Sequence, residues 1–350
     1  MEIERIIRDS VRVLEGYSCA RDEFSGQDAL FMDANESPFD TGYNRYPDPY
    51  QRELKRAVGR VKGVDPARLI LGNGSDELID MLVRSTCEPG RDNMIVFSPS
   101  YAMYEVCGRV NNVEVRSLLL GDNLEPRWET LFDAVDEHSR LLFFCSPNNP
   151  TGNRWPLERM REVADRFPGW VVVDEAYMDF ATGGDASSPA SAVHLQASNP
   201  RVIVLQTLSK AWGMAGLRVG IGIACPGLIA YLNRVKPPYN INAPAQRLAI
   251  TALADEKTFR ERVALITRER ERLRRALLDS GCFDRVFPSE ANFILARHER
   301  YRELYDYLVM NGVVTRVRHA PPLLDSCLRF TVGTPAENER VVELINAWKV

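Results

Sequence analysis

One lysine in this chain lies where it could act as a nucleophile. The segment TLSKAWG, residues 207–213, follows the apolar run 202–205, so Lys210 comes just after a predicted buried strand. The chain has only six lysines, and Lys210 is the one with small and hydroxyl neighbours in such a position. A lysine can form a Schiff base with a carbonyl group when burial or nearby positive charge makes its neutral amine accessible at pH 7. A surface lysine at a helix start is the alternative for this segment alone.

A carboxylate and a phenol follow a second apolar run. Three valines, residues 171–173, lead directly into Asp174, and Tyr177 comes three positions later. A carboxylate at this position can pair with the protonated nitrogen of a pyridine-ring cofactor and keep that ring an electron sink. Tyr177 can donate a hydrogen bond to a phenolic oxygen on the same ring. The rival is the metal-binding strand end of a P-loop ATPase, which requires the pattern GxxxxGK[ST] earlier in the chain. That pattern is absent from the sequence, so the ATPase interpretation is excluded.

A glycine-containing turn precedes a helical pattern in LGNGSDE, residues 71–77. Its glycines let backbone amides approach a phosphate, and Ser75 lies at a predicted helix N-terminus, where an anion is stabilised. A dinucleotide-binding fold needs a third glycine where Glu77 stands, so a nicotinamide cofactor is not expected. A plain capping turn is the alternative, because Ser and Asp are common helix caps.

Two further segments bring polar side chains to the same region. In SPNNPTG, residues 146–152, Asn149 could bind a phenolic oxygen, and Arg218, eight positions after Lys210, could pair with a phosphate. By composition alone the first segment is only a turn. These candidates gain support from their shared position, because they follow predicted strands of one α/β domain, where ligands gather at the carboxyl ends of the strands.

The elements that must position these residues alternate through the middle of the chain. Short, nearly continuous apolar runs are typical of strands buried on both faces of a largely parallel sheet. Helical patterns lie between several of them, for example at 76–87 and 157–167. We therefore predict an α/β large domain over residues 34–246, with helices on both sides of the sheet. The expected strands are 69–71, 94–97, 141–145, 170–173, 202–205 and 219–224.

A smaller α+β domain is expected from residues 1–33 and 247–350. A long charged helical pattern covers 260–278, and the helical pattern 3–14 is expected to pack onto this second unit. The strand candidates in this unit are 291–296, 312–317 and 327–332.

Composition restricts the class of protein. The 350 residues are 45% hydrophobic and 26% charged, and the net charge of −4 provides no polybasic surface for nucleic acid or an anionic membrane. The N-terminus lacks an apolar signal core, and no apolar run reaches the roughly 20 residues that span a bilayer. The seven cysteines are scattered and the four histidines show no ligand spacing, so we expect reduced thiols and no metal. These observations favour a cytoplasmic enzyme.

The assembled segments resemble those of the fold-type I, class-II-like pyridoxal-phosphate-dependent aminotransferases, and within them the histidinol-phosphate aminotransferase family, along nearly the whole chain. The resemblance implies a large domain whose mostly parallel mixed sheet is flanked by helices, plus a smaller α+β domain. Eight motifs occur in order: NESP (35–38), NRYPD (44–48), GNGSDE (72–77), PSYAMY (99–104), SPNNPTG (146–152), DEAY (174–177), TLSKAWGMAGLRVG (207–220) and LRFTVG (328–333).

The resemblance implies pyridoxal 5'-phosphate as the cofactor and gives a role to each candidate. Lys210 would hold it as a Schiff base and move the proton during transamination, and Asp174 would hold the pyridinium. Tyr101 would stack on the ring. The phenolic oxygen would be bound by Tyr177 and Asn149, and the phosphate by Gly74, Ser75, Asp76, Ser209 and Arg218. Tyr46 would reach the phosphate from the neighbouring subunit, which makes the active form a homodimer with shared active sites.

Substrate recognition would rest on two arginines. Arg329 matches the family's carboxylate-binding arginine, whose planar guanidinium grips a carboxylate or phosphate with two parallel bonds. Arg316 matches the arginine that the histidinol-phosphate branch adds for its phosphorylated substrate, with a solvated strand-end charge as the alternative. Tyr17 and Asn35 match other substrate-side positions. The stretch 316–322 departs from the family by an extra arginine and histidine, and Ser37 replaces a commoner asparagine, which puts selectivity rather than chemistry in question.

These assignments imply reversible transamination between histidinol phosphate and imidazole-acetol phosphate, with glutamate and 2-oxoglutarate, in histidine biosynthesis. The alternatives are an aromatic or broad-specificity amino acid aminotransferase and a phosphothreonine decarboxylase. Arg316 discriminates, because two cationic anchors suit a phosphate and one suits a carboxylate. A catalytically silent cofactor-binding regulator is a rival from another class, but such a protein usually has an appended DNA-binding domain or has lost the lysine.

Overall fold

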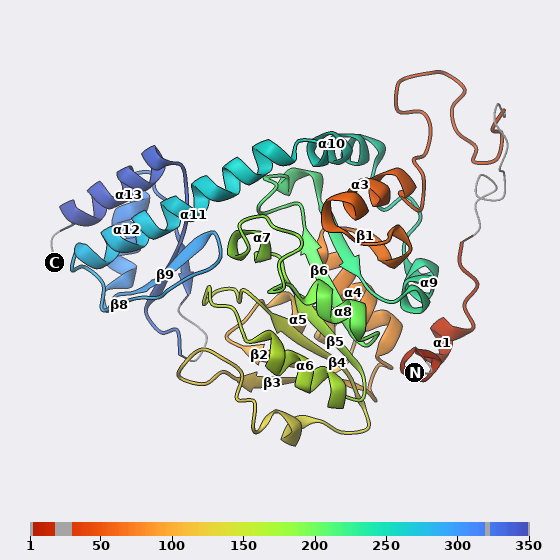
Figure 1. Cartoon of the computed structure of the whole chain (residues 1–350), viewed down its shortest axis with the longest axis horizontal. Coiled ribbons are helices and arrows are strands. Elements are labelled where there is room, and N and C mark those ends of the chain that lie inside the picture. Colours follow the sequence, from red (N-terminus) through yellow and green to blue (C-terminus); the bar gives the residue numbers. More distant parts are fainter. Residues whose placement is uncertain (1–2, 18–29, 319–322, 349–350) are drawn as a thin grey trace.

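Two units lie side by side along the long axis of the molecule (Figure 1). The computed structural model describes residues 3–17, 30–318 and 323–348. The larger unit is built on a seven-stranded sheet with the strand order β1-β7-β6-β5-β4-β2-β3. Its strands are β1 (Leu69–Asn73), β2 (Asn93–Ser98), β3 (Glu114–Leu119), β4 (Ser139–Cys145), β5 (Trp170–Asp174), β6 (Val202–Thr207) and β7 (Val219–Ile223).

The large sheet is mostly parallel, with one reversed strand. From β6 to β3 all neighbouring strands run parallel, whereas β7 is antiparallel to both β6 and β1. Because β7 is reversed, its amino end lies at the same edge of the sheet as the carboxyl ends of the other strands. Arg218, the residue before β7, therefore reaches this edge by preceding a strand, whereas Ser75, Asn149 and Lys210 follow one.

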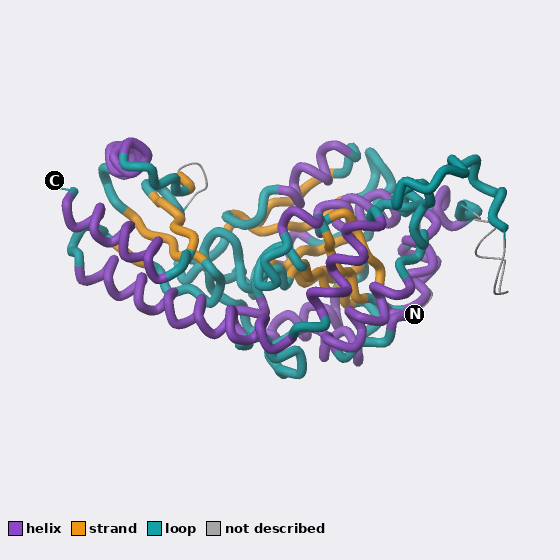
Figure 2. Tube along the Cα trace, turned by 90° about the horizontal axis from the view of Figure 1, so that it is seen from above, coloured by secondary structure: helices purple, strands orange, loops and turns teal. Residues whose placement is uncertain are grey.

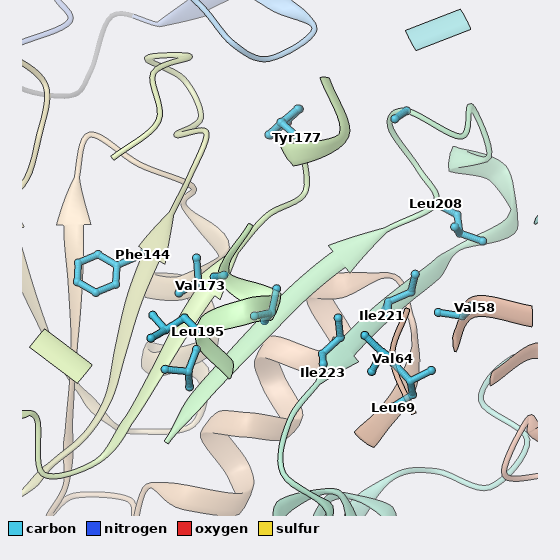
Figure 3. Close-up of a cluster of buried hydrophobic side chains, with 14 of the residues drawn as sticks. Val58, Val64, Leu69, Phe144, Val173, Tyr177, Leu195, Leu208, Ile221 and Ile223 are labelled. Atoms are coloured by element: carbon cyan, nitrogen blue, oxygen red, sulfur yellow. The ribbon is translucent and has the colours of Figure 1, made fainter. Parts of the chain in front are cut away.

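Helices cover both faces of the large sheet, which explains why its central strands β4, β5 and β6 are largely apolar and buried along their length. In β5, Val171 and Val173 pack on one side and Val172 on the other. Figure 3 shows part of the first cluster, from Val58 and Leu69 to Phe144. The helices of this unit are α3 (Arg52–Lys62), α4 (Ser75–Thr86), α5 (Met103–Val110), α6 (Leu157–Arg166), α7 (Met178–Ala181), α8 (Ala192–Ser198), α9 (Pro226–Val235) and α10 (Ala243–Leu253), with short 3-10 turns at Pro66–Arg68, Leu131–Ala134 and Ala215–Leu217.

The small unit is a four-stranded antiparallel sheet with the order β10-β11-β9-β8. Side chains on one face of this sheet, including Leu328 and Phe330, pack with its three helices. Figure 2 shows these helices beside the strands of the small unit, and helices on both sides of the larger sheet. The elements are α11 (Glu256–Asp279), β8 (Arg285–Val286), β9 (Phe293–Arg297), α12 (Tyr301–Met310), β10 (Arg316–Arg318), β11 (Cys327–Thr331) and α13 (Pro335–Ala347).

The N-terminal segment differs from the expectation that it packs on the small unit. The described part forms only a 3-10 turn (Ile3–Ile6) and the short helix α1 (Asp9–Arg12). Its apolar side chains Ile6, Ile7 and Val11 belong to the same buried cluster as residues of α4 and α9. The backbone amide of Arg8 also donates to the carbonyl of Ser85, at 3.0 Å. This segment is therefore part of the large unit.

The boundary between the units lies inside α11, beyond the expected position at 247. Phe259 and Val263, in the first half of this helix, are buried with the large core, whereas Leu273 and Leu277 are buried with the small one. The charged pattern of α11 is amphipathic throughout. It therefore predicted the helix but did not indicate that the helix packs first on the large core and then on the small one.

Several negative findings apply to the described residues alone. No helix among them is long and apolar enough to cross a membrane. The six cysteines they include are free, and no three His, Cys, Asp or Glu side chains among them are grouped so as to hold a metal ion. Cys19 and His319 lie outside the described residues.

Candidate active site

A cavity of about 360 Å³ lies at the edge of the large sheet where β1, β5 and β6 end, and residues of the small sheet complete its lining. Ligands of open α/β sheets bind at this edge. The cavity brings together Ser75, Asp76, Tyr101, Cys145, Asn149, Asp174, Ala176, Tyr177, Thr207, Ser209, Lys210, Arg218, Arg316, Arg318 and Arg329. Most of the residues proposed from the sequence therefore share one site.

Lys210 is positioned by the turn that follows β6. Its Nζ lies over the ring of Tyr177, 5.6 Å from the centroid. Burial lowers the pKa of Lys210 below its ordinary value, the charge of Arg329 lowers it further, and Asp174 and Asp76 act in the opposite direction. The neutral amine is consequently more accessible at pH 7 than that of an ordinary lysine, which is the condition for nucleophilic chemistry.

Asp174, the last residue of β5, is a buried carboxylate with only 3% of its surface exposed. One carboxylate oxygen, Oδ2, accepts a hydrogen bond from the hydroxyl of Tyr104 at 2.7 Å, and Oδ1 accepts one from the backbone amide of Ala176 at 3.0 Å. Burial raises the pKa of Asp174, while the bond from Tyr104 opposes that rise. Within the described residues no cation is paired with Asp174, so the site holds a buried negative charge for a cationic ligand group.

At another part of the cavity, Gly74 and Arg218 are in close contact. Gly74 precedes α4 with φ of +79°, and a Cβ on this residue would lie 2.3 Å from a guanidinium nitrogen of Arg218. Its amide donates to the carbonyl of Arg218 at 2.8 Å. The positive φ favours glycine here, and the first backbone amides of α4, which follow directly, can bind an anion beside this guanidinium.

Asp76 and Tyr101 line the cavity close to Arg218. The Tyr101 hydroxyl donates to Oδ1 of Asp76 at 2.9 Å, and Oδ2 of Asp76 lies 3.7 Å from Nη2 of Arg218. The latter separation is longer than a charge-assisted hydrogen bond, so Asp76 holds Arg218 loosely and leaves its donors for another anion. Burial, followed by the charge of Asp76, raises the pKa of Tyr101, which keeps its hydroxyl protonated.

A chain of hydrogen bonds connects the two units across the cavity. Asn149 donates from Nδ2 to the Tyr177 hydroxyl at 3.3 Å, and Nη1 of Arg329 donates to Oδ1 of Asn149. The guanidinium of Arg329 also lies over the ring of Phe293, at 5.1 Å, and that ring meets Tyr177 edge-on at 5.2 Å between centroids. An anion that draws Arg329 away from Asn149 would therefore also change the hydrogen bonding of the Tyr177 hydroxyl.

Three predicted site residues lie elsewhere in the single chain. Tyr46 stacks on Tyr239 with ring centroids 4.4 Å apart, and Tyr17 meets the edge of the same ring at 6.4 Å. Asn35 and Tyr46 line a separate cavity of about 920 Å³. This chain alone does not bring Tyr17, Asn35 or Tyr46 to the cavity of Lys210.

Two residues of the site, Tyr104 and Thr207, were not predicted from the sequence. Tyr104 is fully buried and contacts Asp174, 70 residues away, so only the tertiary structure reveals it. Thr207 ends β6, and its Oγ1 donates to the carbonyl of Val219 at 3.2 Å and accepts from the Ser209 amide at 3.1 Å. A polar residue ending an apolar strand was the available signal for Thr207.

Comparison with known proteins places the chain in a family. Residues 32–345 match the model of the family described as aminotransferase class I and II, which is most of the chain. The chain belongs to this family and is an aminotransferase.

The particular branch follows from full-length relatives. The chain is 42% identical over 345 residues to the histidinol-phosphate aminotransferase of Flavobacterium johnsoniae, covering 98% of this chain and 97% of the relative. It is 43% identical over 348 residues to the enzyme of that name from Parabacteroides distasonis, covering 99% and 98%. Within the class I and II family, the chain thus belongs with the histidinol-phosphate aminotransferases.

A solved structure supports the fold. The histidinol-phosphate aminotransferase of Sinorhizobium meliloti, solved in complex with pyridoxal-5'-phosphate, superposes with a TM-score of 0.77 at 28% identity. The match covers 87% of this chain and 83% of that one. The predicted fold class, a fold-type I transferase with a large mixed sheet and a small α+β unit, is confirmed.

Proposed function

We propose that this chain uses pyridoxal 5'-phosphate to interconvert histidinol phosphate and imidazole-acetol phosphate, with glutamate and 2-oxoglutarate as the second pair, in histidine biosynthesis. Relatives named for histidinol phosphate at 42% and 43% identity over almost the full chain support this proposal. The observation that carries it is the composition of one cavity, where Lys210 and Asp174 meet an arginine pair, Arg316 and Arg329. We also propose that the enzyme works in the cytoplasm, in keeping with its composition.

The residues present fit the cofactor. Pyridoxal 5'-phosphate combines an aldehyde, a basic ring nitrogen, a phenolic oxygen and a phosphate. The buried, cation-free Asp174 suits the protonated ring nitrogen, and the amine of Lys210 suits the aldehyde. Ser75 at the start of α4, Ser209 and Arg218 line the cavity together and suit the phosphate, with Gly74 directly before this helix. The remaining residues would serve the phosphate, phenolic oxygen and ring face: Asp76, Tyr177, Asn149 and Tyr101.

Lys210 would be both the attachment point of the cofactor and the group that moves the proton. When bound, the cofactor supplies an electron sink that stabilises negative charge at the substrate carbon next to the amine. The lowered pKa of Lys210 would let its Nζ take a proton from that carbon and return it, two atoms away, to the carbon that was the cofactor's aldehyde. Asp174 would keep the ring nitrogen protonated throughout, because its own two oxygens are already fixed by Tyr104 and Ala176.

The arginines of the small sheet would hold the substrate's anionic group. Arg329 is oriented by Asn149 and Phe293, and Arg316 is its direct partner across the strand pair. A guanidinium binds either a carboxylate or a phosphate through two parallel hydrogen bonds. The same group can therefore accept glutamate in one half of the reaction and a phosphorylated amine in the other.

We further propose a homodimer with shared active sites, in which Tyr46, Tyr17 and Asn35 serve the partner's cavity. Support comes from their position outside the cavity of their own chain, where Tyr46 and Tyr17 contact Tyr239 and have 50% and 58% of their surfaces exposed. If Tyr46→Phe and Lys210→Ala subunits are both inactive and exchange freely, mixing them should restore about a quarter of the activity, because half the dimers carry one complete site. Absence of any recovery, with exchange verified, would argue for self-contained sites.

The reaction itself is tested by following the cofactor's absorbance in the purified, loaded enzyme. Addition of histidinol phosphate should convert the cofactor to its amino form at far lower concentration than phenylalanine does. A preference for phenylalanine would transfer the assignment to the aromatic aminotransferases. Failure of the protein to take up the cofactor at all would overturn the proposal.

A further inference from the structure

Three arginines lie on one face of the small sheet. Arg316 and Arg329 are directly opposed in the antiparallel pair of β10 and β11, and Arg318 is two positions from Arg316 on the same strand. Directly opposed residues, and residues two apart in a strand, point to the same side of a sheet. All three side chains line the cavity that contains Lys210. The opposite face of this sheet is occupied by Leu328, Phe330 and the helices of the small unit.

Among the residues that the structure describes, this arginine group has no acidic partner. Within the described ranges 3–17, 30–318 and 323–348, none of the three arginines forms an ion pair, and Nε of both Arg318 and Arg329 is buried without a hydrogen-bond partner. The carboxylates among the described lining residues are Asp76 and Asp174, and both are engaged at the other end of the cavity. A buried donor without a partner is costly, so the arrangement is complete only when an anion enters.

Arg318 is the least expected member of the group. Burial, together with the charges of Arg329 and Arg316, lowers the pKa of Arg318 to about 10. The side chain is therefore held against its like-charged neighbours inside the cavity, and its charge also acts on the Tyr177 hydroxyl. A guanidinium that served only solubility would point to solvent, where this repulsion is screened.

We infer that Arg318 is a third anion-binding residue of the substrate site, which with Arg316 and Arg329 selects a dianionic phosphate monoester over a monoanionic carboxylate. The inference rests on the proposed function and deepens it. Two arginines can satisfy a carboxylate with its two oxygens. A phosphate monoester has three terminal oxygens and a second negative charge, which a third guanidinium can match.

The inference is tested with the cofactor-loaded enzyme and the variant Arg318→Gln, whose side chain keeps hydrogen-bonding capacity but loses the charge. The KM for histidinol phosphate and the inhibition constant for inorganic phosphate should each rise about 10- to 100-fold, as expected for loss of one charge-assisted pair. The KM for glutamate and the inhibition constant for acetate should change less than about threefold, because two arginines remain for a carboxylate. Arg340→Gln, on an exposed part of α13, is the matched control and should change none of these constants.

Two results would overturn the inference: unchanged phosphate constants in Arg318→Gln, or equal losses for phosphate and carboxylate ligands. Arg318→Lys provides a second variant in case the glutamine form folds poorly, and its losses should be intermediate, because it keeps the charge without the planar fork. The rise in Tm of the loaded enzyme with inorganic phosphate, compared with acetate, gives a readout independent of turnover. If the wild-type enzyme ignores histidinol phosphate yet shows this phosphate preference, and Arg318→Gln abolishes it, the proposed function fails while the role of Arg318 stands.

Discussion

The two ends of the active-site cavity are built on opposite principles. At the end formed by the large sheet, the acidic groups have partners within the chain: the buried Asp174 accepts from Tyr104 and Ala176, and the half-exposed Asp76 accepts from Tyr101. At the end formed by the small sheet, arginines stand together without an acid among the described residues. The first end suits a cofactor that remains bound, and the second suits substrate anions that bind and dissociate in each turnover.

The difference shows how one site serves two substrates in turn. A resident cofactor benefits from groups that are already oriented, since no reorganisation is then needed during reaction. Exchangeable substrates with different anions benefit from excess positive charge, which attracts each of them without shape-specific contacts. Changes at the first end should therefore reduce rate, and changes at the second should reduce affinity.

The largest effect is expected at the residue between the two ends. Lys210→Ala should slow amino-group transfer by at least about 10⁴-fold, because it removes both the covalent attachment and the proton carrier. The measurement is the rate of each half-reaction by rapid mixing. Lys257→Ala, on the exposed start of α11, should retain full activity. A rate within tenfold of wild type in Lys210→Ala would eliminate this lysine from the mechanism.

The second effect concerns the buried charge at the cofactor end. Asp174→Asn keeps the size and the bond from Tyr104 but loses the charge, so the rate should fall about 100- to 1000-fold, the range for loss of one preorganised electrostatic group. KM for both substrates should change much less. A variant with a nearly normal rate and a raised KM would show that Asp174 contributes to substrate affinity and not to rate, contrary to the expected difference between the two ends.

Asp174 also predicts a dependence of stability on pH in the cofactor-free protein. Burial raises its folded-state pKa above the ordinary value, so the folded state binds this proton more tightly than the unfolded state does. This contribution is full below about pH 4, the ordinary carboxyl pKa, and is lost as pH rises through the folded-state pKa. Urea unfolding from pH 4 upward should show wild type losing stability relative to Asp174→Asn. A difference independent of pH would contradict the raised pKa.

The third effect concerns the substrate end. Arg316→Gln should raise the KM for histidinol phosphate by about tenfold and leave the rate of proton transfer nearly unchanged. The cofactor-free variant should gain up to about 1 kcal/mol in its free energy of unfolding, since opposed like charges destabilise a strand pair. Steady-state kinetics and urea unfolding measure the two quantities. Loss of stability would show that Arg316 has a structural partner.

Of the two changes at the cofactor end, Tyr104→Phe should have the smaller effect on rate. This change removes one donor from the Asp174 carboxylate and leaves the bond from the Ala176 amide, so we expect about a tenfold fall in kcat. The free energy of unfolding should drop by about 1–3 kcal/mol, the cost of an unsatisfied buried acceptor, which is opposite in sign to Arg316→Gln. A stability equal to wild type would mean that Tyr104 does not hold Asp174.

The sequence predicted those strands whose two faces are both covered. Six strands of the large sheet came from continuous apolar runs, because each must satisfy a hydrophobic layer on either side. The missing strand, β3, lies at the edge of the sheet and is mostly exposed or half-buried, so it has no such run. In the small unit, β8 has only two residues, too few for any periodicity.

The site was predictable where chemistry follows directly after a strand. Lys210 and Asp174 could be located because the carboxyl ends of parallel strands converge at one edge of the sheet. The contact of Tyr104 with Asp174 could not, because it depends on how α5 packs beneath that edge, which local sequence does not encode. Arg318 was visible as a departure in the sequence, but its position beside Arg316 and Arg329 required the strand register.

The helix α11 extends from one hydrophobic core into the other without a break, with Val263 in the large core and Leu273 in the small one. Its 24 residues correspond to a rod about 36 Å long. Neither unit can lose its packing without exposing part of a helix that the other unit needs. The two units should consequently melt as a single thermodynamic body, with one calorimetric transition, although each has a sheet of its own.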